Sequence, residues 1–233
     1  MSENNNNNNN NNQNRTAGTH IVVLLDRSGS MASIATDVIG GFNTYLQEQR
    51  SNGTDARMSI VLFDSQDPQE TIVWGAPISE TLPLTERTFV PRASTPLLDA
   101  TGLTIGRTMV EQQSRAATGL ATEDIIFVTI TDGMENCSRE FTLEKVRKLI
   151  ADRTTDGWQF VYLSAGLDAY GDAHQFGYED GASQAWRSDG DNSRRMFDSL
   201  SKGTSNLREK KRRGMMSMPS EFFETGKDAE DNL

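Results

Sequence analysis

The segment VVLLDRSGSM, residues 22–31, places one carboxylate and two hydroxyls directly after an apolar run. Asp26 is followed by Ser28 and Ser30, and Gly29 separates the two serines. Glycine permits a tight loop at this point, so that both hydroxyls can turn back toward the carboxylate. Oxygen ligands without nitrogen or sulfur suit a hard divalent cation such as Mg²⁺. The segment therefore predicts part of a metal site, with further oxygens supplied from elsewhere in the chain.

Two other segments carry such oxygens. Asp132 follows the apolar run of residues 125–130, and Thr95 directly precedes Pro96. The runs that lead to Asp26 and Asp132 are the two most apolar in the chain, which predicts neighbouring central strands. In an open α/β sheet, ligands bind beyond the carboxyl ends of such strands. We expect the two carboxylates to converge there and the hydroxyl of Thr95 to join them.

The elements that must position these residues alternate between short apolar runs and segments with helical periodicity. The expected strands are residues 21–25, 57–63, 71–78, 125–130 and 158–163. The expected helices carry the apolar stripes Ile34, Val38, Phe42 and Leu46; Leu98, Ile105 and Met109; Leu143, Val146 and Ile150; and Met196, Phe197 and Leu200. This alternation predicts an α/β fold, a doubly wound and mostly parallel sheet with helices on both faces.

Two local signals refine this topology. The short segment DSQDPQE separates the strands at residues 57–63 and 71–78. A parallel crossover needs about a dozen residues, so we expect these strands to pair antiparallel, with residues 71–78 at a sheet edge. For the helix of residues 96–116, Thr95 is the expected N-cap. Pro96 then takes the first helical position, where its missing N–H costs nothing.

The composition of the chain limits its domain organisation and the ligands it can be expected to bind. We expect one domain at residues 19–213, between a disordered Asn-rich tail at residues 1–18 and a flexible polar tail at residues 214–233. The formal net charge of −10 makes nucleic acid an unlikely ligand and suits cations or basic partners. The single cysteine, Cys137, excludes an intramolecular disulfide and a four-thiolate zinc site. Because neither a secretory signal nor a membrane-spanning run is present, we expect a soluble, cytoplasmic protein.

Three motifs together resemble a known metal site. DRSGSM at residues 26–31, STPLLDA at residues 94–100 and ITDGMEN at residues 130–136 are similar to the three segments of the metal ion-dependent adhesion site of von Willebrand factor type A (vWA) domains. The resemblance spans most of the chain. It implies a Rossmann-like sheet with one antiparallel edge strand, in agreement with the topology expected above.

The resemblance also implies a ligand set. The metal ligands would be Asp26, Ser28, Ser30, Thr95 and Asp132, some of them acting through water. Mg²⁺ is the expected ion, with Mn²⁺ or Ca²⁺ as alternatives. Related domains often have glycines where Ala93 and Ser94 stand, so Ser94 is a second candidate for the hydroxyl assigned to Thr95.

The charge of this ligand set suggests a function. Two carboxylates can neutralise a divalent ion while three hydroxyls add no charge, so an acidic side chain of a partner can complete the ion's shell. In the resembled family, a partner's Asp or Glu does this. We therefore expect a non-catalytic protein-binding module within an intracellular assembly, without a membrane contact.

One enzyme class is the alternative. Mg²⁺-dependent phosphoester hydrolases of the aspartyl-phosphate type have a D-x-D motif at such a strand end. Here the second carboxylate is replaced by Ser28, which cannot serve as a general acid at neutral pH. A Ser-His-Asp site has little support, since His20 and His174 are the two histidines and neither is suitably placed.

Three further features have simpler interpretations. The basic run REKKRR, residues 208–213, is expected to be a solvated helix end, because the chain is acidic and no aromatic residues interleave. Cys137 is expected to be buried or inert. Asp99, in the first turn of a helix, is explained by the helix dipole, although a supporting role at the metal site stays open.

Overall fold

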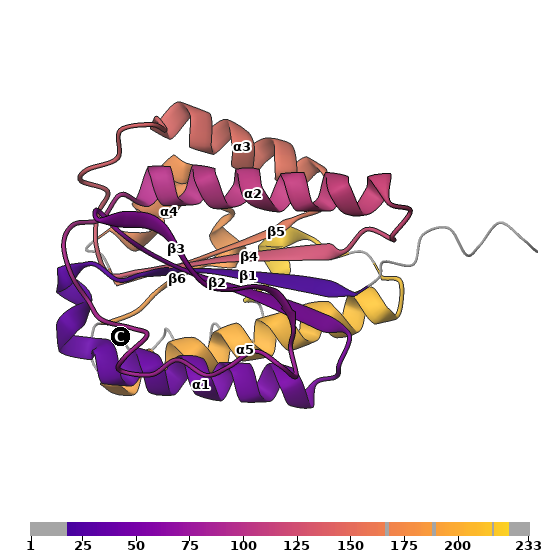
Figure 1. The fold of residues 1–233 in the computed structure, drawn as a ribbon, viewed down its shortest axis with the longest axis horizontal. Helices are drawn as coiled ribbons and strands as arrows, with labels where there is room; N and C mark the ends of the chain where they lie inside the picture. Colours follow the sequence, from indigo (N-terminus) through magenta and orange to yellow (C-terminus); the bar gives the residue numbers. More distant parts are fainter. Residues whose placement is uncertain (1–17, 166–167, 188–189, 216, 224–233) are drawn as a thin grey trace, which may run out of the picture.

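The computed structural model describes residues 18–165, 168–187, 190–215 and 217–223. A six-stranded sheet runs through its middle in the order β3-β2-β1-β4-β5-β6 (Figure 1). The strands are β1 (Thr19–Asp26), β2 (Ala56–Asp64), β3 (Asp67–Pro77), β4 (Asp124–Thr131), β5 (Gln159–Ser164) and β6 (Ser183–Ala185). Strand β1 pairs in parallel with β2 and β4, and the parallel pairing continues through β5 to β6.

Strand β3 pairs antiparallel with β2 at the edge of the sheet. The chain thus has the predicted α/β architecture, a Rossmann-like and mostly parallel sheet with one antiparallel edge strand. The strand that the sequence did not predict is β6, whose three residues are too few to show a hydrophobic pattern.

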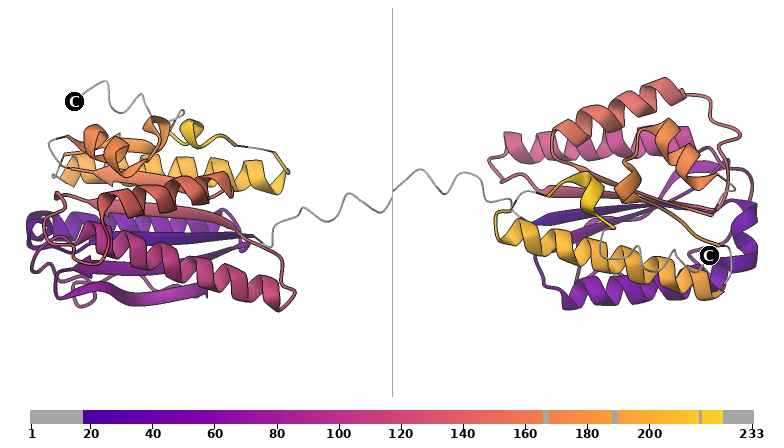
Figure 2. Two further views of the ribbon diagram at one scale, coloured as in Figure 1. Left: turned by 90° about the horizontal axis from the view of Figure 1, so that it is seen from above. Right: turned by 180° about the vertical axis from the view of Figure 1, so that it is seen from behind.

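Helices cover both faces of the sheet, as Figures 1 and 2 show. On one face lie α1 (Ala35–Ser51) and α5 (Gly190–Arg212), and on the other lie α2 (Leu97–Ala117), α3 (Leu143–Thr155) and α4 (Ala169–Phe176). Short 3-10 turns occupy Gly29–Ile34, Asp180–Ala182 and Pro219–Glu221. Within the described ranges, no helix has both the length and the apolar character needed to cross a membrane.

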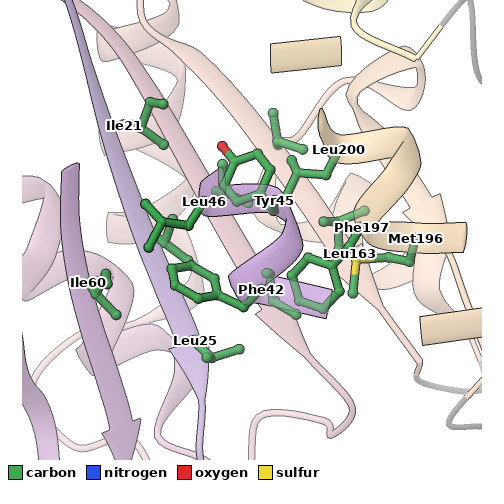
Figure 3. Close-up of a cluster of buried hydrophobic side chains, with 14 of the residues drawn as sticks. Ile21, Leu25, Phe42, Tyr45, Leu46, Ile60, Leu163, Met196, Phe197 and Leu200 are labelled. Carbon is green, nitrogen blue, oxygen red and sulfur yellow. The ribbon is translucent and has the colours of Figure 1, made fainter. Parts of the chain in front are cut away.

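The core has two layers because the side chains of a strand alternate between its faces. From β1, Ile21 and Leu25 enter the layer beneath α1 and α5, whereas Val22 and Leu24 enter the layer beneath the other three helices. Figure 3 shows the first layer, where Phe42 and other side chains of α1 and α5 pack beside Ile21 and Leu25. All residues of β1 are buried, which explains why its sequence is a continuous apolar run.

The predicted cap of α2 is wrong. The helix begins at Leu97, and the residue in the N-cap position is Pro96, which makes no side-chain capping bond. The backbone of Thr95 instead pairs with Asn136, since the Thr95 N–H donates to Asn136 Oδ1 at 3.0 Å and the Thr95 carbonyl accepts from the Asn136 N–H at 3.2 Å. Tertiary pairing has therefore replaced the local capping bond, and the Thr95 hydroxyl is left for other partners.

The basic end of α5 is only in part the solvated helix end that was expected, since Arg212 and Arg213 are exposed but Arg208 is not. Arg208 is buried, and its guanidinium donates to the carbonyls of Gln49 and Gly53 and to the Asp55 carboxylate at 2.7 to 2.9 Å. Arg212 also donates to Asp55. The guanidinium of Arg212, together with that of Arg208, lowers the pKa of Asp55 to about 2. These bonds fasten α5 to the loop that precedes β2.

The packed domain also extends beyond its predicted end at Arg213. Phe222 and Phe223 are buried in the core layer beneath α5, so the prediction of a flexible polar tail from Gly214 fails for this stretch. These two adjacent aromatic side chains belong to no periodic apolar pattern that would mark them as core residues. Residues 1–17 and 224–233, the outer parts of the two predicted tails, lie outside the described residues.

A buried polar cluster lies between β1, β2 and α2. The Nε2 atom of His20 is 2.8 Å from Ser59 Oγ, and its Nδ1 atom is 3.8 Å from the Glu111 carboxylate. This arrangement resembles a Ser-His-Glu triad. However, His20 and Ser59 are fully buried, and the Ser59 hydroxyl also accepts the Gly75 N–H. Because no substrate can reach Ser59, the cluster is structural.

Burial lowers the pKa of His20 to about 4, from 6.5 in an unfolded chain. The charged groups that face its ring are Glu111, Arg57, Glu123 and Arg115. Between these two pH values the unfolded chain binds a proton that the folded protein excludes. The free energy of unfolding should therefore fall as the pH is lowered from about 6.5 to about 4, with a loss of about 3 kcal/mol from this residue.

Urea unfolding at several pH values tests this prediction. The difference in stability between the wild type and His20→Gln should shrink by about 3 kcal/mol over that range. The exposed His174 serves as the control, because His174→Gln should track the wild type. Parallel pH profiles for the wild type and His20→Gln would show that the buried ring does not exclude the proton.

Candidate metal centre

Three loops meet at the carboxyl edge of the sheet. Loop 1 is residues 27–34 after β1, loop 2 is residues 90–96 before α2, and loop 3 is residues 132–142 after β4. Direct backbone bonds join loops 1 and 2: the Gly29 N–H donates to the Ala93 carbonyl at 3.0 Å, and the Arg92 N–H donates to the Arg27 carbonyl at 2.8 Å. The Thr95 and Asn136 pair joins loops 2 and 3.

Asp26 and Asp132 stand at the ends of the neighbouring strands β1 and β4, as predicted. Asp26 is fully buried, and each of its carboxylate oxygens has a donor. The Ser28 N–H donates to Oδ1 at 2.7 Å, and the Thr131 hydroxyl donates to Oδ2 at 2.6 Å. These two bonds hold the carboxylate in one orientation. The side chain of Asp132 is only partly buried and faces the same loops.

The two serines of loop 1 bridge these strand ends. The Ser30 hydroxyl donates to Asp132 Oδ1 at 2.7 Å, and its oxygen is 3.0 Å from that of Ser28. The turn Gly29–Ile34 begins at this point, where the Met31 N–H donates to the Ser28 carbonyl at 3.1 Å. The tight turn expected at Gly29 therefore brings both hydroxyls back over the end of β1.

Gly133 marks the point on which these oxygens converge. A Cβ atom at Gly133 would lie 3.1 Å from Thr95 Oγ1, 3.7 Å from Ser30 Oγ and 3.9 Å from Asp26 Oδ2. Oxygens of the segment 26–30 and of loop 2 thus surround a space that the Cβ atom of any larger residue would enter. Together with the bonds of Ser30 to Ser28 and Asp132, this geometry gathers all five predicted residues in one place.

Thr95, rather than Ser94, reaches this space. Thr95 is buried and its Oγ1 is the nearest atom to the Gly133 position. Ser94 is exposed, and its backbone pairs with Ser65 in the loop after β2. The preceding Ala93 has a φ of 60°, a conformation that favours glycine. Loop 2 therefore keeps the backbone of a glycine position although alanine stands there.

The electrostatics of the site favour a cation. Burial, with a smaller effect of the neighbouring Asp132 charge, raises the pKa of Asp26 to about 6. Burial also raises the pKa of Asp132. The contacts of both carboxylates within the described part of the chain are hydroxyls and N–H groups, with no Lys or Arg among them. A buried carboxylate beside a partly buried one, without a cationic side chain, is unfavourable, and a bound cation would stabilise both.

The donor set fits a hard divalent cation. It consists of two carboxylates and three hydroxyls, the oxygen ligands that Mg²⁺, Mn²⁺ and Ca²⁺ accept. Over the ranges that the structure describes, no group of three or more His, Cys, Asp or Glu side chains is placed to hold a metal ion. An ion at this site would therefore rely on hydroxyls and water in addition to Asp26 and Asp132.

Loop 3 positions Thr95 through residues that the sequence analysis did not single out. The Glu135 carboxylate accepts the Leu98 N–H at the start of α2 at 2.8 Å, and also accepts the N–H groups of Cys137 and Ser138. These bonds hold the start of α2 against the end of β4. The signal for this function was present in the motif ITDGMEN, whose Glu and Asn stand two and three residues after the glycine.

Asp99 makes tertiary contacts in addition to its place in the first turn of α2, while its supporting role at a metal site stays a prediction. Its carboxylate accepts three successive backbone N–H groups of loop 3, those of Arg139, Glu140 and Phe141, at 2.8 to 2.9 Å. It therefore ties α2 to loop 3, which the helix dipole alone does not explain. In the same loop, burial raises the pKa of the partly buried Cys137 thiol, in keeping with an inert cysteine.

Arg27 fastens loops 1 and 2 to the sheet edge. Its buried guanidinium donates to Asp64 at the end of β2 and to Glu70 of β3. Arg92 of loop 2 donates to the same two carboxylates at 3.0 and 3.2 Å. The second residue of the DRSGSM motif thus anchors the loop, while its neighbours Asp26 and Ser28 face the site.

Comparisons with known proteins show the fold. No protein-family model matches this sequence, and no curated protein sequence matches it. The pilus adhesin SpaC from Lactobacillus rhamnosus GG has a TM-score of 0.60 and 11% identity, covering 84% of this chain and 31% of the adhesin. Proximal thread matrix protein 1 from the mussel byssus has a TM-score of 0.52 and 15% identity, covering 82% of this chain and 48% of that one.

A vWA domain is also among the structural neighbours. The SpRpn10 VWA domain has a TM-score of 0.49 and 8% identity, covering 76% of this chain and 92% of that domain. The chain spans less than half the length of the adhesin and of the thread protein. At these identities the similarity concerns the fold alone.

Removal of the Asp99 carboxylate should destabilise the folded protein. Asp99→Ala leaves three N–H groups of loop 3 without their acceptor, so we expect the free energy of unfolding to fall by about 2 to 3 kcal/mol. Asp37 provides the matched control, since it also lies in the first turn of a helix. Asp37→Ala should cost less than about 1 kcal/mol.

Urea unfolding of both variants shows whether Asp99 stabilises the protein through the helix dipole alone or through its hydrogen bonds to loop 3. A similar loss for Asp99→Ala and Asp37→Ala would mean that the helix dipole is sufficient and that the bonds to loop 3 add nothing.

Proposed function

We propose that this chain is a vWA domain whose metal ion-dependent adhesion site binds a partner protein. The ion would be held by Asp26, Ser28, Ser30, Thr95 and Asp132. An exposed Asp or Glu of the partner would provide a further oxygen ligand. The observation that carries this proposal is the convergence of oxygens from the end of β1, loop 1 and loop 2 around Gly133 of loop 3. The Asp26 carboxylate among them is buried, and its hydrogen-bond donors in the described part of the chain are a hydroxyl and an N–H group.

The exposure of the ligands supports an open position on the ion. Asp26 and Thr95 are buried beneath the site, whereas Ser30 is exposed and Asp132 is partly exposed. An incoming oxygen would approach from the side of Ser30 and Asp132. The two carboxylates balance the charge of a divalent ion, and the hydroxyls leave it electrophilic enough to attract a third carboxylate.

Mg²⁺ is the ion that we propose, with Mn²⁺ or Ca²⁺ as alternatives that the same oxygen set accepts. The fold supports a binding function, since a pilus adhesin shares it. We further propose that the protein acts in the cytoplasm as part of a larger assembly.

The geometry is less suited to an aspartyl-phosphate hydrolase. Such an enzyme needs a free oxygen on its nucleophilic aspartate and a second carboxylate two residues later. Both oxygens of Asp26 accept hydrogen bonds, and the hydroxyl of Ser28 contacts that of Ser30. This arrangement favours Asp26 as a fixed ligand, and we propose a non-catalytic module.

Calorimetric titration of Mg²⁺ and of Mn²⁺ into the full chain tests the metal site. We expect binding of about one equivalent to the wild type, and an affinity at least about tenfold lower in a Ser28→Ala, Ser30→Ala double variant. Thr95→Ala should weaken binding in the same way. The adjacent Ser94→Ala is the matched control and should bind like the wild type.

Circular dichroism and urea unfolding would confirm that each variant keeps its fold. If the double variant bound Mg²⁺ as tightly as the wild type, the proposed ligand set would be refuted. Equal losses in Ser94→Ala and Thr95→Ala would instead refute the assignment of the loop 2 hydroxyl.

A further inference from the structure

The surface that loops 1 and 2 present beside the candidate site is made of small or uncharged residues. The exposed positions there are Gly29, Ser30, Ala32, Ser33, Val90, Ala93 and Ser94. Short side chains at these positions leave the ion's open side accessible to a flat or protruding partner segment. Loop 3 differs, because Arg139 and Glu140 are exposed there and Met134 has 66% of its surface exposed.

The carboxylates that support these loops are engaged inside the protein. Asp64 and Glu70 are paired with Arg27 and Arg92. Asp99 and Glu135, the carboxylates that join α2 to loop 3, accept backbone N–H groups. Although the chain carries a net charge of −10, two of these four carboxylates are neutralised by arginines, and the other two are hydrogen bonded. Asp64 and Glu70 would therefore repel an acidic partner little.

Met134 is adjacent in sequence to Gly133, the residue whose Cβ position lies 3.1 Å from Thr95 Oγ1. Met134 is therefore one residue from the point on which the site's oxygens converge, and its side chain is exposed there. A methionine is flexible and polarizable, so it adapts to different aliphatic side chains. One exposed apolar residue is ordinary on a protein surface, but this one lies two residues after Asp132, a predicted metal ligand.

We propose that Met134 selects the partner sequence. The partner segment would carry an aliphatic side chain within two residues of the acidic one, so that the carboxylate binds the ion while the aliphatic side chain packs on Met134. In an extended segment, residues two apart point to the same side at a separation of about 7 Å, which is within reach of a methionine next to the site. This inference rests on the metal-dependent binding proposed above and deepens it.

Capped seven-residue peptides provide the probe. Two of them have a central glutamate, with either leucine or serine two residues away on both sides. The third is the leucine peptide with glutamine in place of glutamate. Binding to the ¹⁵N-labelled full chain is followed by NMR titration in Mg²⁺ and in EDTA. The proteins are the wild type, Met134→Ser and Met218→Ser.

Met218 is a matched control because it is a methionine with 63% of its surface exposed. Its neighbours Ser217 and Pro219 line a cavity with Asp124, at the amino end of β4 and thus at the opposite edge of the sheet. In the wild type and in Met218→Ser, the leucine peptide should bind about threefold to tenfold more tightly than the serine peptide, as expected for partial burial of an aliphatic side chain.

In Met134→Ser the two glutamate peptides should bind with similar affinity, while Mg²⁺ affinity measured by calorimetry stays unchanged. If glutamate peptides bind only in Mg²⁺ but leucine gives no gain, or if the gain persists in Met134→Ser, this inference is overturned and the metal-dependent function stands. If binding is absent, or survives EDTA or the replacement by glutamine, metal bridging itself fails and the selection by Met134 fails with it.

Discussion

The parallel pairing of β1 with β4 is the constraint on which the rest of the structure depends. Its register places Leu25 opposite Ile130, so the next residues of each strand leave the sheet at the same edge. Asp26 and Asp132 therefore face one space, although 105 residues of chain lie between them. A shift of one residue in either strand would turn its alternating side chains to the opposite face and separate the two carboxylates.

This pairing brings two carboxylates together, which is electrostatically unfavourable, and groups in the surrounding loops bind them. A carboxylate as buried as Asp26 is unfavourable unless it is hydrogen bonded or neutralised. Thr131 and the Ser28 backbone supply two hydrogen bonds, and these fix the carboxylate without neutralising it. Asp64, by contrast, is neutralised by two arginines. The edge thus combines carboxylates that are compensated internally with a central pair that a cation would compensate.

The two edges of the sheet are built differently, and the difference suits a binding site. At the amino edge, Arg208 and Arg212 of α5 join the loop before β2 through Asp55. At the carboxyl edge the loops are exposed, but they are tied to strands and helices by Arg27 and Asp99. Groups held on rigid elements keep their geometry better than groups on free loops, which is what metal ligation requires.

The sequence by itself determined the order and type of the main elements. Continuous apolar runs predict buried parallel strands, and the seven residues between two runs are too few for a parallel crossover, so β3 had to be antiparallel. It also indicated the five site residues, because strand-end aspartates and alternating serines are local patterns. Their proximity follows from neighbouring strands ending at one edge. Their part in metal binding stays a prediction.

The tertiary structure decided which partner each polar group found. Thr95 pairs with Asn136, 41 residues away, instead of capping α2, and Arg208 is buried against Gln49, 159 residues away, instead of lying in solvent. Propensity and spacing describe contacts between residues close in sequence, so they could not foresee either choice. Phe222 and Phe223 show the same limit. They lie in a segment without a periodic apolar pattern, and it is the folded core that buries them.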